Sequence, residues 1–436
     1  MQLSFRSSFS TLLVCSAWCL AGALGASSAE ADETCQSPFL PKIAGQEDFI
    51  YVWTLGIEGL GDGSDKLVTV GANPERPGYG EVIHSLSLGG RHEAHHGGLS
   101  DDRRYYWLGG LDDSKIFIVD IGTDPLEPRL VRTIDDFSEA TGGVVGPHGF
   151  YALPGRMLIS ALSNEEGTGR TALVEYSNEG EYIRTIWMPE GAEYGYDARV
   201  NVDLNRMLTS SFTGKNNYMR PLGELIQDPE AMKNFGNSVV VWDFHARKPL
   251  QVLEIPGAPL EIRWALGPRH HYAFTTAALT SRLWGIFREP DGSFEAVDLA
   301  EIGDASATPL PVDISLSSDD RFLFVSTFMD GTVRVFDVSE PRAPTVVYEQ
   351  KLGNQTNMVS QSWDGERVYF TSSLLSQWDR PDPLEDEQYL KAFDWNGREL
   401  VPRFEIDFRA ERLGRPHLMR FGQLDLYRTA GAGAAE

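Results

Sequence analysis

The sequence predicts an all-β fold, a seven-bladed β-propeller closed by pairing of the C-terminal strand with the N-terminal blade. Short alternating strands bounded by Gly, Asp, Asn and Pro recur throughout, and no apolar segment keeps a helical period for long. The strands come in about seven sets of roughly fifty residues, with about four strands in each set. A propeller is one of the standard folds that remove exposed sheet edges. A pair of β-sandwiches is the alternative, but it does not require a recurring period.

The N-terminal segment 1–31 predicts a Sec-type signal peptide with an approximate cleavage point. Arg6 precedes an apolar run from Leu12 to Leu24, and small residues follow it. We therefore expect a periplasmic protein with one propeller domain over 32–427, a disordered tail over 428–436 and no membrane span after signal removal. An uncleaved anchor is the alternative, although the apolar run is short for a span.

Cysteine usage limits the chemistry that the mature chain can perform. Cys15 and Cys19 lie in the apolar run and are expected to leave with the signal peptide, so only Cys35 remains. A single cysteine forms no internal disulfide and supplies no thiolate cluster. Any metal must therefore be held by histidine, carboxylate or carbonyl groups.

The charge balance indicates the kind of partner. The formal net charge is −25, and the sequence contains no concentrated basic patch. A nucleic acid would be repelled by such a protein. A small or neutral substrate fits better.

The repeating unit is clearest in the segments that begin at Arg103 and Asp320. Each runs through a strand, a polar turn, a strand, a D-[IV]-x-x-x-P turn and a further strand. Similar units begin at or near Phe49, Arg156, Arg206, His271 and Arg367. The unit near Phe49 starts directly in its second strand, and residues near 415–421 are expected to supply the missing innermost strand. The acidic insert 221–236 is the segment with the strongest helical character.

Several histidines fall at one position of this repeat. The chain has nine, and three of them lie in RHEAHHGGLSDDRRYYW, residues 91–107. The position eight residues before the start of the second strand lies on the innermost strand, which faces the channel. Its occupants in the six internal units are His96, His148, Ala198, Arg263, Asp313 and Val359. His417 has the equivalent place in the closing strand, and His95 is retained because a shift of one residue reverses the face of a strand.

Imidazoles that converge from neighbouring inner strands are typical of a metal site. The candidate ligands are His95, His96, His148 and His417. Imidazole suits copper, zinc, iron and nickel, and the lack of cysteine or methionine nearby in sequence disfavours a blue-copper electron-transfer centre. The alternative is that these histidines line the channel and are satisfied by water and backbone.

The remaining polar residues of interest have simpler interpretations. Strand ends or turns are expected for His84, His92, His245, His270 and His271, and His92 is also a candidate for the surroundings of the site. The same channel is expected to be lined by Asp197, Glu261, Arg263 and Asp313. Buried ion pairs that hold blades together explain these four charges about as well as a catalytic role does.

Five stretches resemble the selenium-binding protein family, and within it the exported bacterial members, the methanethiol oxidases. They are EAHHGGLSDDRR at 93–104, PLEIRW at 259–264, DISLSSDDRFLFVSTFMDGTVRVFDVSEPRAP at 313–344, SSLLSQWD at 372–379 and RPHLMRF at 415–421. The long block at 313–344 is specific, and the shorter ones would be weak alone. The resemblance extends from ETCQSP to FGQLDLY.

The resemblance implies a propeller oxidase in which copper, held by histidines, converts methanethiol, O₂ and water into formaldehyde, hydrogen sulfide and hydrogen peroxide. The histidine motifs of the family match His95, His96, His148 and His417. A copper ion would lower the pKa of the bound thiol and carry single electrons to O₂. Asp313 and Glu261 are the candidates for the proton acceptor.

The chain also departs from the pattern of this family. Many relatives carry HTxHC where this chain has HGFYA at 148–152, so Tyr151 and Ala152 replace a histidine and a cysteine. The cysteine proposed to bind selenium in animal relatives aligns with Gly80. These differences argue against selenium binding through that thiol and leave the copper chemistry in place.

Two further functional classes stay open at the sequence level. One is a non-catalytic propeller that binds copper or selenium or docks a partner, since fold alone does not give function. The other is a propeller oxygenase with iron held by four histidines. The latter needs histidines distributed over more blades, and the corresponding position in the fourth to sixth units holds none.

Overall fold

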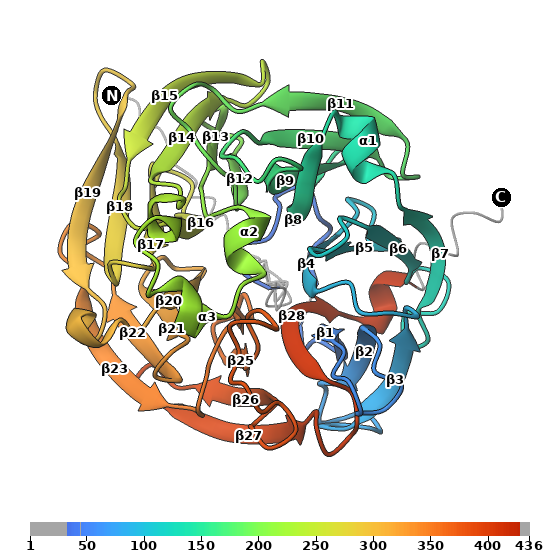
Figure 1. Ribbon diagram of the computed structural model, residues 1–436. Coiled ribbons are helices and arrows are strands. Elements are labelled where there is room, and N and C mark those ends of the chain that lie inside the picture. Colours follow the sequence, from blue (N-terminus) through green and yellow to red (C-terminus); the bar gives the residue numbers. More distant parts are fainter. Residues whose placement is uncertain (1–32, 44, 428–436) are drawn as a thin grey trace, which may run out of the picture.

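The computed structural model describes residues 33–43 and 45–427 and shows seven four-stranded sheets arranged as blades around a central axis (Figure 1). Every pairing within a blade is antiparallel. The prediction of a seven-bladed propeller is therefore confirmed. The predicted signal peptide and C-terminal tail lie outside the described residues.

The blades follow one another along the chain, and the four strands of each lie side by side from the axis to the rim. From the axis outward, blade 1 comprises β28 (Arg415–Gly422), β1 (Phe49–Leu55), β2 (Lys66–Gly71) and β3 (Val82–Ser87). Blade 2 comprises β4 (Ala94–Leu99), β5 (Tyr105–Gly110), β6 (Ile116–Asp120) and β7 (Arg129–Ile134). Blade 3 comprises β8 (Val144–Leu153), β9 (Arg156–Asn164), β10 (Ala172–Ser177) and β11 (Tyr182–Trp187).

The other four blades repeat this order. Blade 4 comprises β12 (Ala198–Asn201), β13 (Arg206–Thr209), β14 (Ser238–Asp243) and β15 (Lys248–Glu254). Blade 5 comprises β16 (Pro259–Trp264), β17 (Tyr272–Ala277), β18 (Arg282–Arg288) and β19 (Phe294–Glu301). Blade 6 comprises β20 (Pro311–Leu316), β21 (Phe322–Thr327), β22 (Thr332–Asp337) and β23 (Thr345–Lys351). Blade 7 comprises β24 (Val359–Gln361), β25 (Arg367–Thr371), β26 (Tyr389–Trp395) and β27 (Leu400–Asp407).

Burial falls from the axis to the rim of each blade. All residues of β1 and β2 are buried, whereas β3 alternates between half-buried and exposed residues. An inner strand packs against a neighbouring blade on each of its two faces. The side chains on both faces are therefore buried. Outer strands have one solvated face and keep the alternation typical of antiparallel sheets.

The ring is closed by its two ends. In blade 1, β28 pairs with β1 so that Ile50 lies opposite Phe421 and Val52 opposite Met419. Figure 1 shows this C-terminal strand, in red, beside the first blue strands. The pairing removes the last open inner edge of the ring, and it confirms that the segment near 415–421 supplies the missing strand.

Helices are few and short in the described chain. The named ones are α1 (Phe137–Thr141), α2 (Lys215–Tyr218), α3 (Leu222–Leu225) and the 3₁₀ turns η1 (Ala231–Lys233) and η2 (Ala305–Ala307), and residues 424–427 form one further helical turn. The segment 221–236, expected to be the most helical, contains α3 and η1 rather than one continuous helix, because Pro229 lacks an N–H and disfavours the helical conformation at Asp228. The Asp228 carboxylate instead accepts hydrogen bonds from the N–H groups of Glu230 and Ala231.

No helix in the described ranges is long and apolar enough to cross a membrane.

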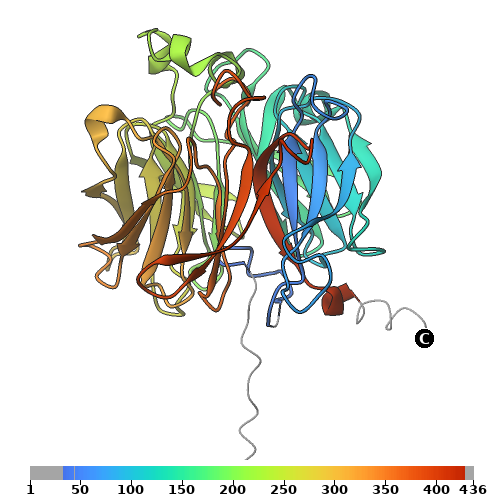
Figure 2. The same cartoon turned by 90° about the horizontal axis from the view of Figure 1, so that it is seen from below.

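The insert that contains α2 and α3 and the N-terminal segment 33–43 lie at opposite ends of the channel. Figure 2 shows the yellow-green insert above one face of the ring and the dark blue N-terminal segment at the other. The N-terminal segment is tied to blade 7 because the Thr34 N–H donates to the Gln361 carbonyl.

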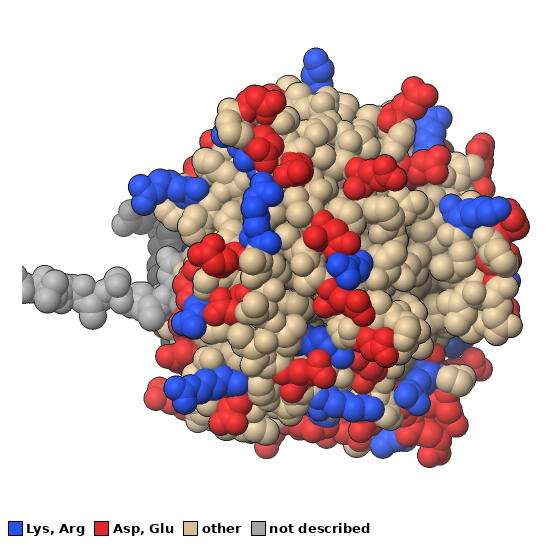
Figure 3. Space-filling view, turned by 90° about the vertical axis from the view of Figure 1, so that its left-hand side faces the viewer, with Lys and Arg blue, Asp and Glu red and all other residues tan. Residues whose placement is uncertain are grey.

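On the side of the molecule shown in Figure 3, basic side chains are interspersed with acidic ones and form no patch.

Candidate metal centre

Irregularities in the inner strands aim the candidate ligands at the axis. The register of β4 on β5 shifts between Ala94 and Gly97, where His95 and His96 lie. The register of β8 on β9 shifts between Pro147 and Gly149, around His148. The pairing of β28 with β1 shifts beside His417 as well. A β-bulge re-aims side chains, and this explains how consecutive residues such as His95 and His96 both face the channel.

The four imidazoles form one buried cluster. The ring centroids of His95 and His417 are 4.0 Å apart, and those of His96 and His148 are also 4.0 Å apart. The ligand atoms of His95, His96 and His417 lie within 4.8 Å of one another, and this trio forms a group able to hold a metal ion. His148 completes the cluster beside His96.

Each imidazole has one ring nitrogen without a hydrogen-bond partner in the described chain. These atoms are Nδ1 of His95 and Nε2 of His96, His148 and His417. The other nitrogen of His148 donates to the Tyr196 carbonyl (2.9 Å), and that of His417 donates to the Ser373 carbonyl (2.8 Å). A carbonyl can only accept, so these bonds place the proton on Nδ1 and leave the Nε2 lone pair free. The donor set therefore fits a metal ion bound by imidazole.

Burial keeps these imidazoles neutral. Desolvation lowers the pKa of His148 to about 4 and that of His417 to about 3. It also lowers the pKa of His95 and His96 well below the usual value, and the neighbouring imidazoles add to this effect. Neutral imidazole is the form that binds a metal.

Glu261 lies behind His96. Its Oε1 is 3.7 Å from Nδ1 of His96 and is buried without a hydrogen-bond partner among the described residues. Its Oε2 is held by Arg263 (2.6 Å) and Arg199 (3.3 Å). Burial alone would raise the pKa of Glu261, but these two guanidinium groups hold it down at about 2.

The other candidate carboxylate, Asp313, lies one step further from the histidines. One of its oxygens accepts from Arg263 (2.9 Å) and from the Ile314 N–H, and the other accepts from the Val359 N–H (2.8 Å). Burial raises its pKa to about 7, although Arg263 opposes the change. Burial also raises the pKa of Asp197 to about 7, and Arg199 opposes that shift.

The remaining histidines lie away from this cluster. His92 pairs with Asp113 (2.7 Å), and its ring packs on Phe117 rather than on the other imidazoles. His270 pairs with Asp320 near the surface, and His84 lies in the outer strand β3. Cys35 is buried, burial raises the pKa of its thiol, and its thiol lies 3.7 Å from the Leu316 carbonyl.

Sequence reasoning did not select Tyr196, Ser373 or Leu374 as parts of the site. Tyr196 and Ser373 orient His148 and His417 through backbone carbonyls, and the backbone of Leu374 favours protonation of His95. Every residue type carries a backbone carbonyl, so composition and motifs give no signal for these roles. Asn357, whose Nδ2 is 2.9 Å from Nδ1 of His417, lies near the repeat position of its unit.

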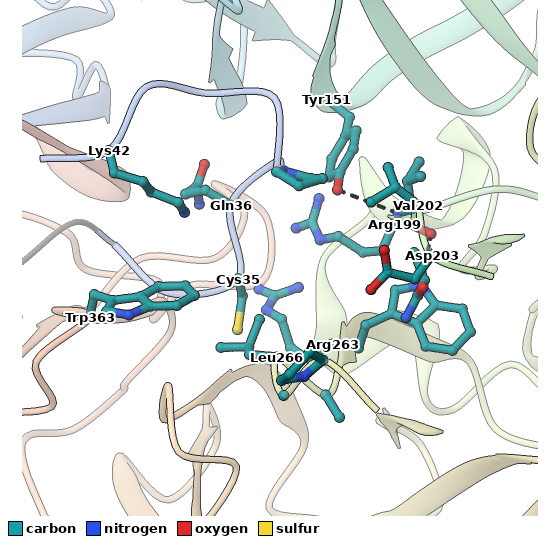
Figure 4. Close-up of a pocket in the computed structure, with 17 residues that line it drawn as sticks. Cys35, Gln36, Lys42, Tyr151, Arg199, Val202, Asp203, Arg263, Leu266 and Trp363 are labelled. Carbon is teal, nitrogen blue, oxygen red and sulfur yellow. Dashed lines mark hydrogen bonds between the residues drawn. The ribbon is translucent and has the colours of Figure 1, made fainter. Parts of the chain in front are cut away.

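Two kinds of cavity reach the cluster. A polar one touches His96 and is lined by Glu261, Arg263 and Asp313. It shares Cys35 and Arg199 with a wider cavity of about 270 Å³ (Figure 4). An apolar one touches His95 instead. The cluster is therefore polar on one side and apolar on the other.

The family model described as the 56 kDa selenium binding protein matches residues 29–426 of the sequence. The chain belongs to this selenium-binding protein family. The methanethiol oxidase of Ruegeria pomeroyi is 55% identical over 412 residues, which cover 91% of this chain and 94% of that protein. The methanethiol oxidase of a Hyphomicrobium species is 55% identical over 396 residues, which cover 90% of each chain.

A solved member of the selenium-binding family has the same architecture. The X-ray structure of a hypothetical selenium-binding protein from Sulfolobus tokodaii matches with a TM-score of 0.76 and 27% identity. The match covers 87% of this chain and 94% of that one. The propeller thus belongs to a known family fold.

Proposed function

We propose that this protein is a copper-dependent methanethiol oxidase, which converts methanethiol, O₂ and water into formaldehyde, hydrogen sulfide and hydrogen peroxide. The observation that carries the proposal is the set of four neutral, buried imidazoles, each with an unpartnered ring nitrogen. The two bacterial relatives at 55% identity, both named methanethiol oxidase, support the choice of reaction.

Copper is the metal that we propose for this centre. The ligands would be His95, His96, His148 and His417. Bound copper would polarise the thiol sulfur and transfer electrons one at a time toward O₂, which closed-shell zinc cannot do. The chain itself contributes a dry site, because all four histidine side chains are buried.

We propose Glu261 as the nearest proton acceptor and Asp313 as an acceptor further along the same network. Glu261 has an unpartnered oxygen 3.7 Å from His96. A pKa of about 2 makes Glu261 a poor final store for a proton, whereas Asp197 and Asp313 have pKa values of about 7. A side-chain hydrogen bond couples Glu261 with Asp197, so a proton taken up at Glu261 can pass to Asp197. Arg263 contacts Glu261, Asp197 and Asp313 and balances their negative charge.

We also propose that the protein is exported to the periplasm through its N-terminal segment 1–31. The support is the charged start, apolar run and small residues of that segment. Export would release peroxide and sulfide outside the cytoplasm. Fractionation of cells and N-terminal sequencing of the mature protein test this; a cytoplasmic protein with an intact N-terminus would refute it.

The metal assignment is tested by elemental analysis of the periplasmically expressed protein, with O₂ uptake and H₂S release measured on methanethiol. We expect copper in the wild type and loss of both copper and turnover in His148→Ala and His417→Ala. His245→Ala, at an exposed histidine, is the matched control and should retain both. Retained copper and full turnover in both channel variants would refute the site. Iron instead of copper would favour an iron oxygenase, and copper without O₂ uptake would favour a binding protein.

A further inference from the structure

The cavity on the His95 side is small and apolar. Apart from His95, its wall is made of apolar and aromatic side chains, among them Tyr196, Phe212, Leu279, Val312 and Trp378. The aromatic rings are in edge contact, with centroids 5.5 Å apart for Phe212 and Trp378 and also for Tyr196 and Phe212. Its volume of about 10 Å³ is close to the minimum that holds one water molecule. Such a hole favours a small apolar group over water.

The insert between blade strands β13 and β14 forms the roof over this cavity. Tyr218, Leu225 and Phe235 of the insert belong to the same apolar cluster as Phe212 and Trp378. The Tyr218 hydroxyl donates to the Leu111 carbonyl and ties the insert to blade 2. Burial of this apolar surface stabilises the roof and shields the His95 side of the centre from water.

One lining residue lies nearer the protein surface than the others. Leu279 is half-buried, whereas the other lining residues are buried. Two lining residues also have a buried nitrogen without a partner among the described residues, Nδ1 of His95 and Nε1 of Trp378.

The His96 side of the histidine cluster is polar and charged. Arg199, Glu261 and Arg263 line the polar cavity at His96, and Figure 4 shows both guanidinium groups beside the wider cavity that continues from it. An alkyl group placed there would desolvate charges without replacing their hydrogen bonds. A thiol at the centre therefore has one favourable orientation, with its carbon chain on the His95 side.

We propose that the apolar cavity walled by Phe212, Val312 and Trp378 is the subsite for the alkyl group of the thiol, and that Phe212 limits the length of that group. This inference rests on the proposed oxidation of a small thiol at the histidine cluster. A methyl group, which is somewhat larger than a water molecule, would fill this hole completely. Each further methylene must displace a wall side chain, and packed walls resist such changes.

The experiment compares methanethiol with propanethiol in the copper-loaded wild type and in Phe212→Leu and Val312→Ala. The measured quantity is the ratio of kcat/KM for the two thiols, from O₂ uptake. We expect Phe212→Leu to raise the propanethiol-to-methanethiol ratio on the order of tenfold, because one or two methylenes in an apolar pocket change specificity by this order. Val312→Ala should raise it by a smaller factor. Phe324→Leu, a buried phenylalanine of blade 6, is the matched control and should leave it unchanged.

A second measurement needs neither copper nor turnover. Xenon occupies apolar cavities, and crystals of metal-free Phe212→Leu under xenon pressure should show it beside His95. An unchanged ratio in both cavity variants, with methanethiol turnover intact, would overturn the subsite. A wild type that oxidises no thiol would overturn the proposed function instead. In that case xenon beside His95 supports the apolar subsite and its absence overturns it.

Discussion

At the residue scale, backbone carbonyls and one carboxylate fix the ring orientation of the histidines in the centre. The carbonyls of Tyr196 and Ser373 orient His148 and His417, and the Glu261 carboxylate faces Nδ1 of His96. Such partners fix the ring orientation and make imidazole a better ligand. The repeat position at His96 and His148 was readable in the sequence, whereas the carbonyl partners were not.

Replacement of Glu261 by glutamine tests the role of its carboxylate. Gln keeps the size of the side chain but removes the charge beside His96. We expect roughly a 10–100-fold loss in copper affinity or in kcat, the range found when such a partner is removed. Copper titration and O₂ uptake measure these effects, and Glu254→Gln on the exposed rim is the control. Wild-type affinity and kcat in Glu261→Gln would contradict a role for this group.

The pH dependence of the metal-free protein tests the burial of His148. Its pKa falls from 6.5 to about 4 through desolvation, so the unfolded chain takes up this proton first as the pH drops. The free energy of unfolding is therefore unaffected by this group above pH 6.5. It decreases by about 3 kcal/mol as the pH falls from 6.5 toward 4.

Comparison with His148→Gln isolates this contribution, because Asp197 and Asp313 titrate in both proteins. Denaturant unfolding at pH 7, 5.5 and 4.5 should show a steeper loss of stability in the wild type than in the variant. Parallel pH profiles would show that His148 is not kept neutral by the fold.

At the element scale, bulges and small residues bring the inner strands close enough to share a site. Gly98 follows the two histidines of β4, and a Cβ there would overlap the Phe150 carbonyl of β8 and lie 2.8 Å from the Phe150 Cβ. The HHGG stretch thus combines two candidate ligands with close packing of blades 2 and 3. The strand pattern predicted β4 and β8, but bulges depend on pairing across strands and left no clear mark in the sequence.

Gly98→Ala tests this close approach. The clash is with backbone, which cannot move aside cheaply, so we expect a loss of about 1–3 kcal/mol in the free energy of unfolding and weaker copper binding. Gly223→Ala in α3 is the matched control, because a Cβ there meets nothing within 4 Å. Chemical denaturation and copper titration give both quantities; equal behaviour of the two variants would refute the packing argument.

At the scale of the whole molecule, closure of the ring and assembly of the candidate metal centre depend on the same strand. β28 completes blade 1 through its pairing with β1 and also carries His417 into the channel. The candidate ligand of the C-terminal strand therefore meets the candidate ligands of blades 2 and 3 only when the ring is closed. The repeat pattern in the sequence predicted this closure, because the first unit lacks an inner strand of its own.

Truncation after residue 414 separates closure from ligation. Without β28 the inner edge of β1 and the apolar residues packed against it are exposed, so we expect the loss of cooperative thermal unfolding. His417→Ala keeps the strand and should unfold cooperatively while binding copper poorly. Calorimetry on both proteins measures the difference. A truncated chain with a wild-type transition would show that β28 is dispensable for the fold.

The sequence by itself determined the number of blades, their closure and the set of histidines at the inner position. These features follow from local patterns, because strand alternation and a repeat of roughly fifty residues are written along the chain. Only the tertiary structure decided which nitrogens stay unpartnered, that Glu261 rather than Asp313 lies beside His96, and that the centre is polar on one side and apolar on the other. These features depend on register shifts and on packing between blades that are distant in sequence, where a single residue of shift reverses the direction of a side chain.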